Sequence, residues 1–297
     1  MIEKYVIELG FACLLVLVAI TFVRGKRRNQ QIADEVFGAI RGSLEAHFSV
    51  VGCTPNEPVK AVGYDAFDVW ASGHPLIKYL LVKLDTRSRQ EFWVRYLLSY
   101  VFSQKDSLHV EVELENLRDS FALLILKKTK VASAEKLHDS FEGLKFMRLS
   151  GNNLPTSLAA VADNEQVSAF LTPQANTWLE GPVGACLQTA FVGDLLVGFR
   201  THGGKNTIQI ELDLPQDLAS LASLVKLVVH WATLASELSL KDKSKKQVQK
   251  ARASIAEKVK EAEKEKAEQA KQERRRQQRL AEEEKYNRMS TAEKRKY

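Results

Sequence analysis

The feature that most constrains this chain is the apolar run YVIELGFACLLVLVAITFV, which occupies residues 5–23. A helix over this run would be about 28 Å long at 1.5 Å per residue, close to the thickness of the hydrocarbon layer of a bilayer. The run contains one charged residue, Glu8, near its start. The sequence therefore predicts one transmembrane helix over 5–23.

Basic residues are distributed unequally on the two sides of this run. RGKRR follows it at once, whereas Lys4, offset by Glu3, is the only basic side chain ahead of it. This excess predicts that the chain after the run is cytosolic and that residues 1–4 lie on the other side. A cleaved signal peptide would carry its basic residues before the run, and a buried core helix would not be followed by RGKRR, so a span is favoured over both. The candidate membrane-flanking residues are Arg24, Lys26, Arg27 and Arg28.

Residues 24–240 are predicted to form one α+β domain in the cytosol. Apolar residues at spacings of four in 30–48 predict a helix that continues from the span. The alternation in HVEVELE (109–115) and TIQIELDL (207–214) predicts half-buried strands with their apolar members facing inward. The other predicted elements are strands at 76–84, 121–128, 186–192 and 195–202, helices at 91–102 and 132–141, a helical connector at 142–183 and a hairpin turn at Gly203-Gly204.

A long helix from about Gln216 to Leu240 is predicted to close the domain, although it is apolar enough to suggest a second membrane span. Its polar residues recur at steps of three and four and form one continuous stripe. A lipid-exposed helix would place Lys226 near the bilayer centre at a cost of about 2.5–3.5 kcal/mol. A domain helix with one solvent-facing stripe is therefore favoured, whereas a second span would move the tail to the opposite side of the membrane.

The sequence lacks the patterns that are typical of catalytic and metal sites. Cys13, Cys53 and Cys186 are far apart, and the six histidines form no HxxxH or HExxH pair. GxSxG, GxxxxGK[ST] and GxGxxG motifs are absent. Gly203-Gly204-Lys205 lies between two predicted strands, which favours a hairpin turn over a phosphate-binding loop. We therefore expect no enzymatic activity, no cofactor and no bound metal.

Residues 241–297 are strongly basic, with 20 Lys and Arg against 11 Asp and Glu, whereas residues 1–240 carry 23 against 26. Such asymmetry indicates an anionic partner, either nucleic acid or a lipid surface. The tail lacks Pro and Gly, and acidic residues recur three positions before basic ones, each pair stabilising a helix by about 0.2–0.5 kcal/mol. An apolar heptad seam starting at Val248 lasts only about two heptads. The sequence therefore predicts a basic helical tail, favoured over a coiled coil or a disordered segment.

The densest basic cluster of the tail lies in KQERRRQQRL, residues 271–280. The arginine fork can bind two phosphate oxygens at once, which suits salt-dependent contact with an RNA backbone or with lipid headgroups. A solvated helix face without a partner is the alternative. The candidate ribosome- or RNA-binding residues are Lys271, Arg274, Arg275, Arg276 and Arg279.

Several stretches together resemble the calumin family, also called coiled-coil domain-containing protein 47. They are GKRRNQQIADEVFGAIRGSLEAHF after the span, HVEVELENLRDSFALLILKKT and NNLPTSLAAVADNEQVSAFL in the body, and MSTAEKRKY at the end. The resemblance implies a protein of the endoplasmic reticulum membrane with a lumenal N-terminus and a cytosolic α+β domain. Family members carry a signal peptide and an acidic lumenal region before the span, whereas residues 1–4 precede it here. The resemblance therefore does not by itself imply lumenal calcium binding for this chain.

The same resemblance implies the partners and the function. Family members join a small membrane protein, Asterix, in an intramembrane chaperone complex beside the Sec translocon, on ribosomes that make multipass membrane proteins. The basic helical tail, with its cluster of arginines, would then contact ribosomal RNA. The alternative function is a membrane tether whose basic helix binds anionic lipid or a helical partner protein.

Overall fold

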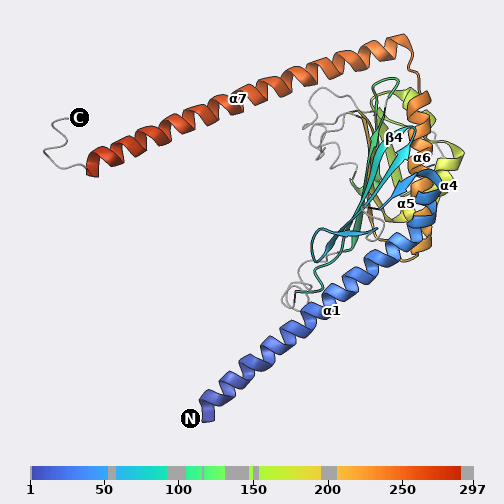
Figure 1. The fold of residues 1–297 in the computed structure, drawn as a ribbon. Helices are drawn as coiled ribbons and strands as arrows, with labels where there is room; N and C mark the ends of the chain where they lie inside the picture. The colour runs from blue at the N-terminus through green and yellow to red at the C-terminus, as the bar shows by residue number, and fades with distance from the viewer. Residues whose placement is uncertain are drawn as a thin grey trace. The chain divides into compact units, whose positions relative to one another are not determined.

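The computed structural model describes residues 2–52, 58–91, 105–115, 117–130, 147–149, 154–194 and 206–288. These residues form an α+β fold with a large antiparallel sheet and an apolar N-terminal helix, which confirms the predicted fold class at that level (Figure 1). The chain divides into two compact units, Met1–Val248 and Gln249–Tyr297. The predicted boundaries of 5–23, 24–240 and 241–297 stay predictions.

Helix α1 (Ile2–His47) runs without a break through the predicted span and into the body. Its second half carries the predicted stripe at spacings of four, and these side chains are buried in the core. Gly52, which follows the two-residue strand Val50–Val51, has a φ of +95°, a conformation that glycine adopts without strain. The stripe consists of Ile32, Val36, Ile40 and Leu44, with Phe48 directly after the helix.

Ten strands form one sheet, in which every recorded strand pair is antiparallel. The strand order is β1-β3-β4-β5-β10-β9-β6-β8-β7, and β2 pairs with β3 outside this path. The strands are β1 (Val50–Val51), β2 (Lys60–Ala61), β3 (Ala66–His74), β4 (Ile77–Asp85), β5 (Ser107–Leu114), β6 (Ala122–Lys127), β7 (Met147–Arg148), β8 (Leu158–Ala162), β9 (Leu187–Asp194) and β10 (Asn206–Asp213).

The two strands with the cleanest predicted alternation lie side by side at the centre of the sheet. β5 pairs with β10, and Val112 lies opposite Ile208. All six apolar residues that were predicted to face inward are at most 3% exposed, because alternate side chains of a strand share one face. This confirms the two strands and their inward faces: Val110, Val112 and Leu114 on β5, and Ile208, Ile210 and Leu212 on β10.

The prediction of a helical connector over 142–183 is wrong at β7 and β8, which pair with each other. The sequence LAAVA has high helix propensity through its alanines, yet it pairs with β6 along its whole length. Burial of Leu158 and Ala160 against the core overrides that local preference. Strand β3 was also not predicted from the sequence. Apart from Glu91, the predicted helices at 91–102 and 132–141, the strand at 195–202 and the Gly203-Gly204 turn lie outside the described residues.

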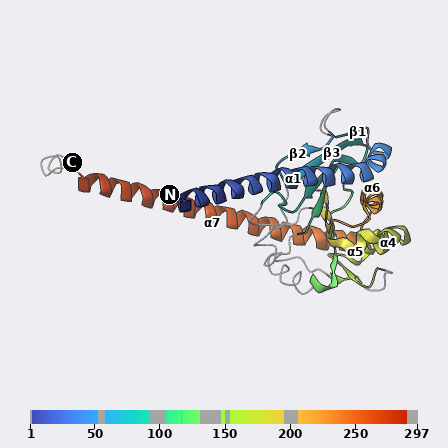
Figure 2. The same ribbon diagram turned by 90° about the horizontal axis from the view of Figure 1, so that it is seen from below.

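Helices cover one face of the sheet and enclose the core against it, as Figures 1 and 2 show. The second half of α1 packs beside α6, and α4 and α5 contact α6. Trp231 on α6 is fully buried, whereas Lys226 in its polar stripe is exposed. The remaining helices are η2 (Lys128–Lys130), η3 (Glu165–Phe170), α4 (Pro173–Glu180), α5 (Pro182–Cys186), η4 (Leu218–Ser220), α6 (Leu221–Glu237) and α7 (Asp242–Arg288).

Candidate functional site

The first half of α1 exposes apolar side chains that a water-facing helix would not carry. Leu9 is 67% exposed and Leu15 is 68% exposed. Two helical segments of the described chain are long and apolar enough to cross a membrane, Glu8–His47 and Leu218–Glu237. The apolar window of the first is 11% buried, whereas that of the second is 44% buried. The second therefore packs within the domain, and the first leaves most of its apolar surface exposed.

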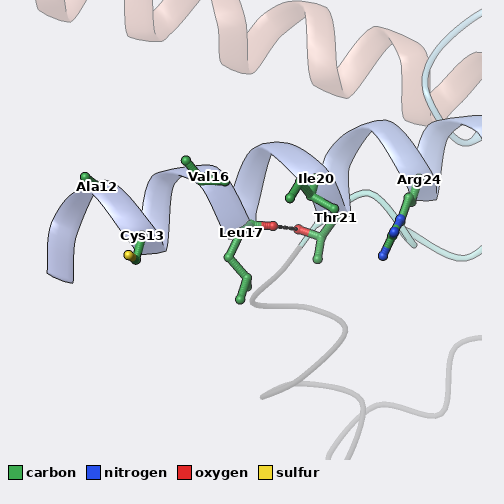
Figure 3. A pocket seen from close by; sticks show the side chains of 7 residues that line it. All are labelled: Ala12, Cys13, Val16, Leu17, Ile20, Thr21 and Arg24. Atoms are coloured by element: carbon green, nitrogen blue, oxygen red, sulfur yellow. Dashed lines mark hydrogen bonds between the residues drawn. The ribbon is translucent and has the colours of Figure 1, made fainter. Parts of the chain in front are cut away.

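A groove runs along one side of this exposed half (Figure 3). The hydroxyl that lines it, Thr21 Oγ1, donates to the carbonyl oxygens of Leu17 at 3.0 Å and Val18 at 2.8 Å. The hydroxyl is thus satisfied within the helix, as an apolar environment requires. The groove residues are Ala12, Cys13, Val16, Leu17, Ile20, Thr21 and Arg24.

The predicted membrane-flanking residues Arg24, Lys26, Arg27 and Arg28 are all exposed on α1. At about 100° per residue, Arg24, Arg27 and Arg28 lie within an arc of about 100°, and Lys26 lies about 100° beyond Arg27. Arg28 lies 3.7 Å from the carboxylate of Glu35, an exposed pair that contributes little to stability. The arrangement gathers three of the four side chains on one side of α1, where they can contact phosphates.

Directly among these basic residues, the body of the domain meets α1. Gly25 is buried, and a Cβ atom at this position would overlap the carbonyl oxygen of Arg89 and the backbone nitrogen of Gln90. A glycine in a helix interior costs about 0.5–1 kcal/mol relative to alanine. Here it allows the loop after β4 to touch the helix backbone, just beyond the end of the predicted span.

Asn29 is the centre of a buried polar network at this contact, and its side chain is inaccessible to solvent. Its Nδ2 donates to the carbonyl oxygens of Tyr64 and Arg87 and to Gln90 Oε1, each at 3.2 Å. Its Oδ1 accepts a hydrogen bond from Arg89 Nη1 at 3.0 Å. A single side chain therefore joins α1 to two loops that are distant in sequence.

The network continues from Arg89 to Asp106, which accepts two hydrogen bonds from the guanidinium, at 2.8 and 2.6 Å. Burial alone would raise the pKa of Asp106, but the hydrogen bonds from Arg89 and from the Arg87 N–H outweigh it and lower the pKa. Bidentate pairs of this kind fix geometry as well as adding energy. The loop after β4 is thus held rigidly against α1.

An aromatic contact closes the same junction. The ring of Tyr64, in the loop between β2 and β3, meets the ring of Phe22 edge-on at 5.2 Å. The ammonium of Lys26 lies 5.4 Å from the centre of the Tyr64 ring. We call Phe22, Gly25, Lys26 and Asn29 together with Tyr64 and Arg89 the α1 junction.

The sequence indicated the basic members of this region but not the residues that hold the body to it. Gly25 inside a helical basic cluster was the available signal, because an isolated glycine in a helix often marks a close approach. Asn29, Tyr64, Arg89 and Asp106 carry no signal of their own, since they come from segments that only the fold brings together.

A second buried polar contact attaches the start of α7 to the domain, within the first compact unit. Asp119, whose side chain is 1% exposed, forms an ion pair with Lys245 and accepts a hydrogen bond from the Leu240 N–H at 2.9 Å. Burial alone would raise the pKa of Asp119, but the hydrogen bonds from Lys245 and Leu240 outweigh it and lower the pKa below its ordinary value of 3.8. Val248, the first residue of the predicted heptad seam, is 5% exposed.

The predicted phosphate-binding residues of α7 are all exposed. At about 100° per residue, Lys271, Arg274, Arg275 and Arg279 lie within an arc of about 140°, and Arg276 lies about 60° beyond it. Helical geometry therefore gathers four of the five on one face, which could follow a phosphate backbone. We call these five residues the arginine cluster.

Comparison with known proteins gives one family. The model of the family described as "PAT complex subunit CCDC47" matches residues 4–297. Proteins named PAT complex subunit CCDC47 from Mus musculus and Homo sapiens are each 23% identical over 289 residues, covering 86% of this chain and 58% of those proteins. The Danio rerio protein of the same name is 23% identical over 290 residues. The chain thus spans 58% of the length of these relatives.

Among solved structures, the mycobacterial trehalose monomycolate transport factor A, TtfA, matches 61% of this chain and 78% of its own chain, at 11% identity. The TM-score of 0.31 is too low to support an argument about the fold. The family model, in contrast, agrees with the resemblance that the sequence motifs indicated, and it covers nearly the whole chain. The protein therefore belongs to the family of PAT complex subunit CCDC47.

Proposed function

We propose that this protein is a single-pass subunit of a PAT-type complex in the endoplasmic reticulum membrane, where it assists the biogenesis of multipass membrane proteins. The family match over residues 4–297 carries the proposal. The exposed apolar half of α1, followed by four exposed basic residues, supports membrane anchorage. Its partners in this proposal are an Asterix-type small membrane subunit, the Sec translocon and the ribosome.

The proposed topology follows from the charges that flank the span. The N-terminus lies in the lumen, and the α+β domain and α7 lie in the cytosol, because the basic residues concentrate after the apolar run. The burial of α6 in the domain supports a single span, since a second span would place α7 on the lumenal side. Insertion of a glycosylation acceptor before residue 5 or after residue 240 tests this, and only the first should be glycosylated in microsomes.

The arginine cluster on α7 is proposed to contact ribosomal RNA. All five side chains are exposed and can meet phosphates, and contact with the RNA backbone requires no base recognition. Such binding is electrostatic and weakens steeply as the salt concentration rises. The tail would thus act as a sequence-independent contact on a ribosome that is already engaged at the membrane.

Co-sedimentation with ribosomes across a salt series tests this contact. The variant changes Arg274, Arg275, Arg276 and Arg279 to Glu. The matched control changes four exposed lysines at or near the start of α7 to Glu, which alters the net charge equally: Lys241, Lys243, Lys246 and Lys250. We expect the arginine variant to lose about tenfold or more in affinity and to show a shallower salt dependence. Equal losses in variant and control would reject a specific role for the cluster.

The alternative, a tether whose basic helix binds anionic lipid or a helical partner, is separated by the same variants. The protein is first reconstituted into liposomes through its span, and anionic liposomes are then added. The added liposomes should float together with the protein-bearing ones only if α7 binds them. Retained ribosome binding with loss of liposome clustering in the arginine variant would favour the tether. No enzymatic activity, cofactor or metal is part of the proposed function.

A further inference from the structure

We infer that the α+β domain itself enters the headgroup layer of the membrane, through the loop of residues 62–65 between β2 and β3. The proposed contact residues are Val62 and Tyr64, with anionic phospholipids as the occupant of this surface. The inference rests on the proposed span of α1, because the span sets the level of the bilayer along the helix. It adds a second membrane contact, which belongs to the domain and not to the span.

The depth of the loop relative to the bilayer follows from its contacts with α1. The Tyr64 ring touches Phe22, which belongs to the last turn of the predicted span, and it lies beside Lys26 in the basic cluster. Asn29 Nδ2 donates a hydrogen bond to the carbonyl oxygen of Tyr64. A tyrosine between the final apolar turn and the first basic residues is at the depth where aromatic belts of membrane proteins occur.

The loop is built to hold its position. The N–H groups of Val62 and Gly63 both donate to the carbonyl oxygen of Ala66, at 2.9 and 3.2 Å. Asp65 accepts hydrogen bonds on its carbonyl oxygen from the Thr86 N–H and hydroxyl, and on Oδ2 from Ser88. The backbone is therefore tied to both β3 and the loop after β4, so the loop tip presents a fixed surface.

The exposed side chains at this tip are apolar. Val62 is 61% exposed and Tyr64 is 52% exposed, although Tyr64 already contacts α1. Tyr64 adjoins the span through Phe22, and Val23, the last residue of the span, is 47% exposed. An exposed apolar tip that adjoins a membrane-spanning helix gains free energy when it enters the same lipid environment.

The charges around the tip favour an anionic lipid surface. Arg24, Lys26, Arg27 and Arg28 are exposed on α1, and Arg87, which lies 4.0 Å from Asp106, is exposed on the loop after β4. Among the acidic groups at this level, Asp65 accepts from Ser88 and Asp106 binds Arg89, whereas Glu91 is exposed, so basic residues outnumber the exposed acidic one. Basic residues close to a membrane surface attract anionic lipid, and this attraction extends over about one Debye length.

Photo-crosslinking to lipid tests the inference in the full chain, reconstituted into nanodiscs of phosphatidylcholine and phosphatidylserine. A photoreactive diazirine side chain replaces Val62 in the test variant and Leu15, inside the span, in the positive control. The matched negative control replaces Val50, which is similarly exposed at 55% but follows the end of α1. Along α1, the last residue of the helix lies about 36 Å beyond the end of the span.

We expect lipid adducts at positions 15 and 62 and only background at position 50. Adducts at 15 with background at 62 would overturn the inference while leaving the span intact. Background at both 15 and 62 would overturn the proposed span and the inference with it. Adducts at 50 as strong as at 62 would also overturn it, because the labelling would then report general lipid adsorption of the domain.

Discussion

Two helices of nearly equal length, α1 with 46 residues and α7 with 47 residues, are stabilised by opposite means. α1 owes its position to apolar burial and to the Asn29 network, and its exposed half is suited to lipid. Beyond Val248, the described side chains of α7 are all exposed and mostly polar or charged, with local acid-base pairs as the support of the helix. Equal length therefore says nothing about which helix tolerates substitution, whereas the origin of its stability does.

The largest expected difference comes from the same substitution on the two helices. Leu44 on α1 is fully buried, and Leu44→Ala should lower the free energy of unfolding by about 2–5 kcal/mol through lost burial and a cavity. Leu280 on α7 is 52% exposed, and Leu280→Ala should change it by less than about 0.5 kcal/mol. Urea unfolding of the protein in detergent, followed by tryptophan fluorescence, measures both. Similar losses would mean that α7 packs like a core helix.

A smaller loss is expected at the polar part of the α1 junction. Asn29→Ala removes the hydrogen bonds to two carbonyl oxygens and to the Gln90 side chain, and one of the acceptors of Arg89. Leaving buried polar groups without partners costs about 1–3 kcal/mol of folding free energy. Gln272→Ala, an amide removed from an exposed site on α7, is the matched control and should have almost no effect. The same unfolding measurement compares them. An unaffected Asn29→Ala protein would show that the network contributes nothing to stability.

The sequence predicted the elements that depend on local patterns and missed those that depend on contacts between distant segments. Patterns that repeat locally, such as the stripe at 30–48 and the alternation in β5 and β10, led to correct elements, because one face of each is buried. Strand β8 was missed because its alanines favour a helix, and only its pairing with β6 decides otherwise. The contacts that hold the α1 junction together were not predictable for a related reason, since Asn29, Tyr64 and Arg89 acquire their roles only through contacts distant in sequence.

A pH-dependent effect is expected where α7 joins the body. The pKa of Asp119 is lowered in the folded state, so its ionised form stabilises the fold above the ordinary value of 3.8. This contribution is lost as the pH falls below 3.8 and through the lowered folded-state pKa. Asp119→Asn should therefore reduce the difference in unfolding midpoint between pH 5 and lower pH values. Lys243→Gln, a neighbouring exposed charge change, is the control, and an equal effect of both variants would contradict the role of Asp119.

The smallest effect is expected within the charged helix itself. Arg276→Gln exchanges residues of similar helix propensity but removes the pairing of Arg276 with Glu273, three positions earlier, which is worth about 0.2–0.5 kcal/mol. Circular dichroism should show slightly reduced helicity at low salt and no difference at high salt, because screening removes the pair's contribution in the parent protein as well. The unfolding midpoint of the α+β domain should not change. A loss of domain stability of more than about 1 kcal/mol would show that α7 is supported by tertiary contacts, and the contrast between the two helices would then fail.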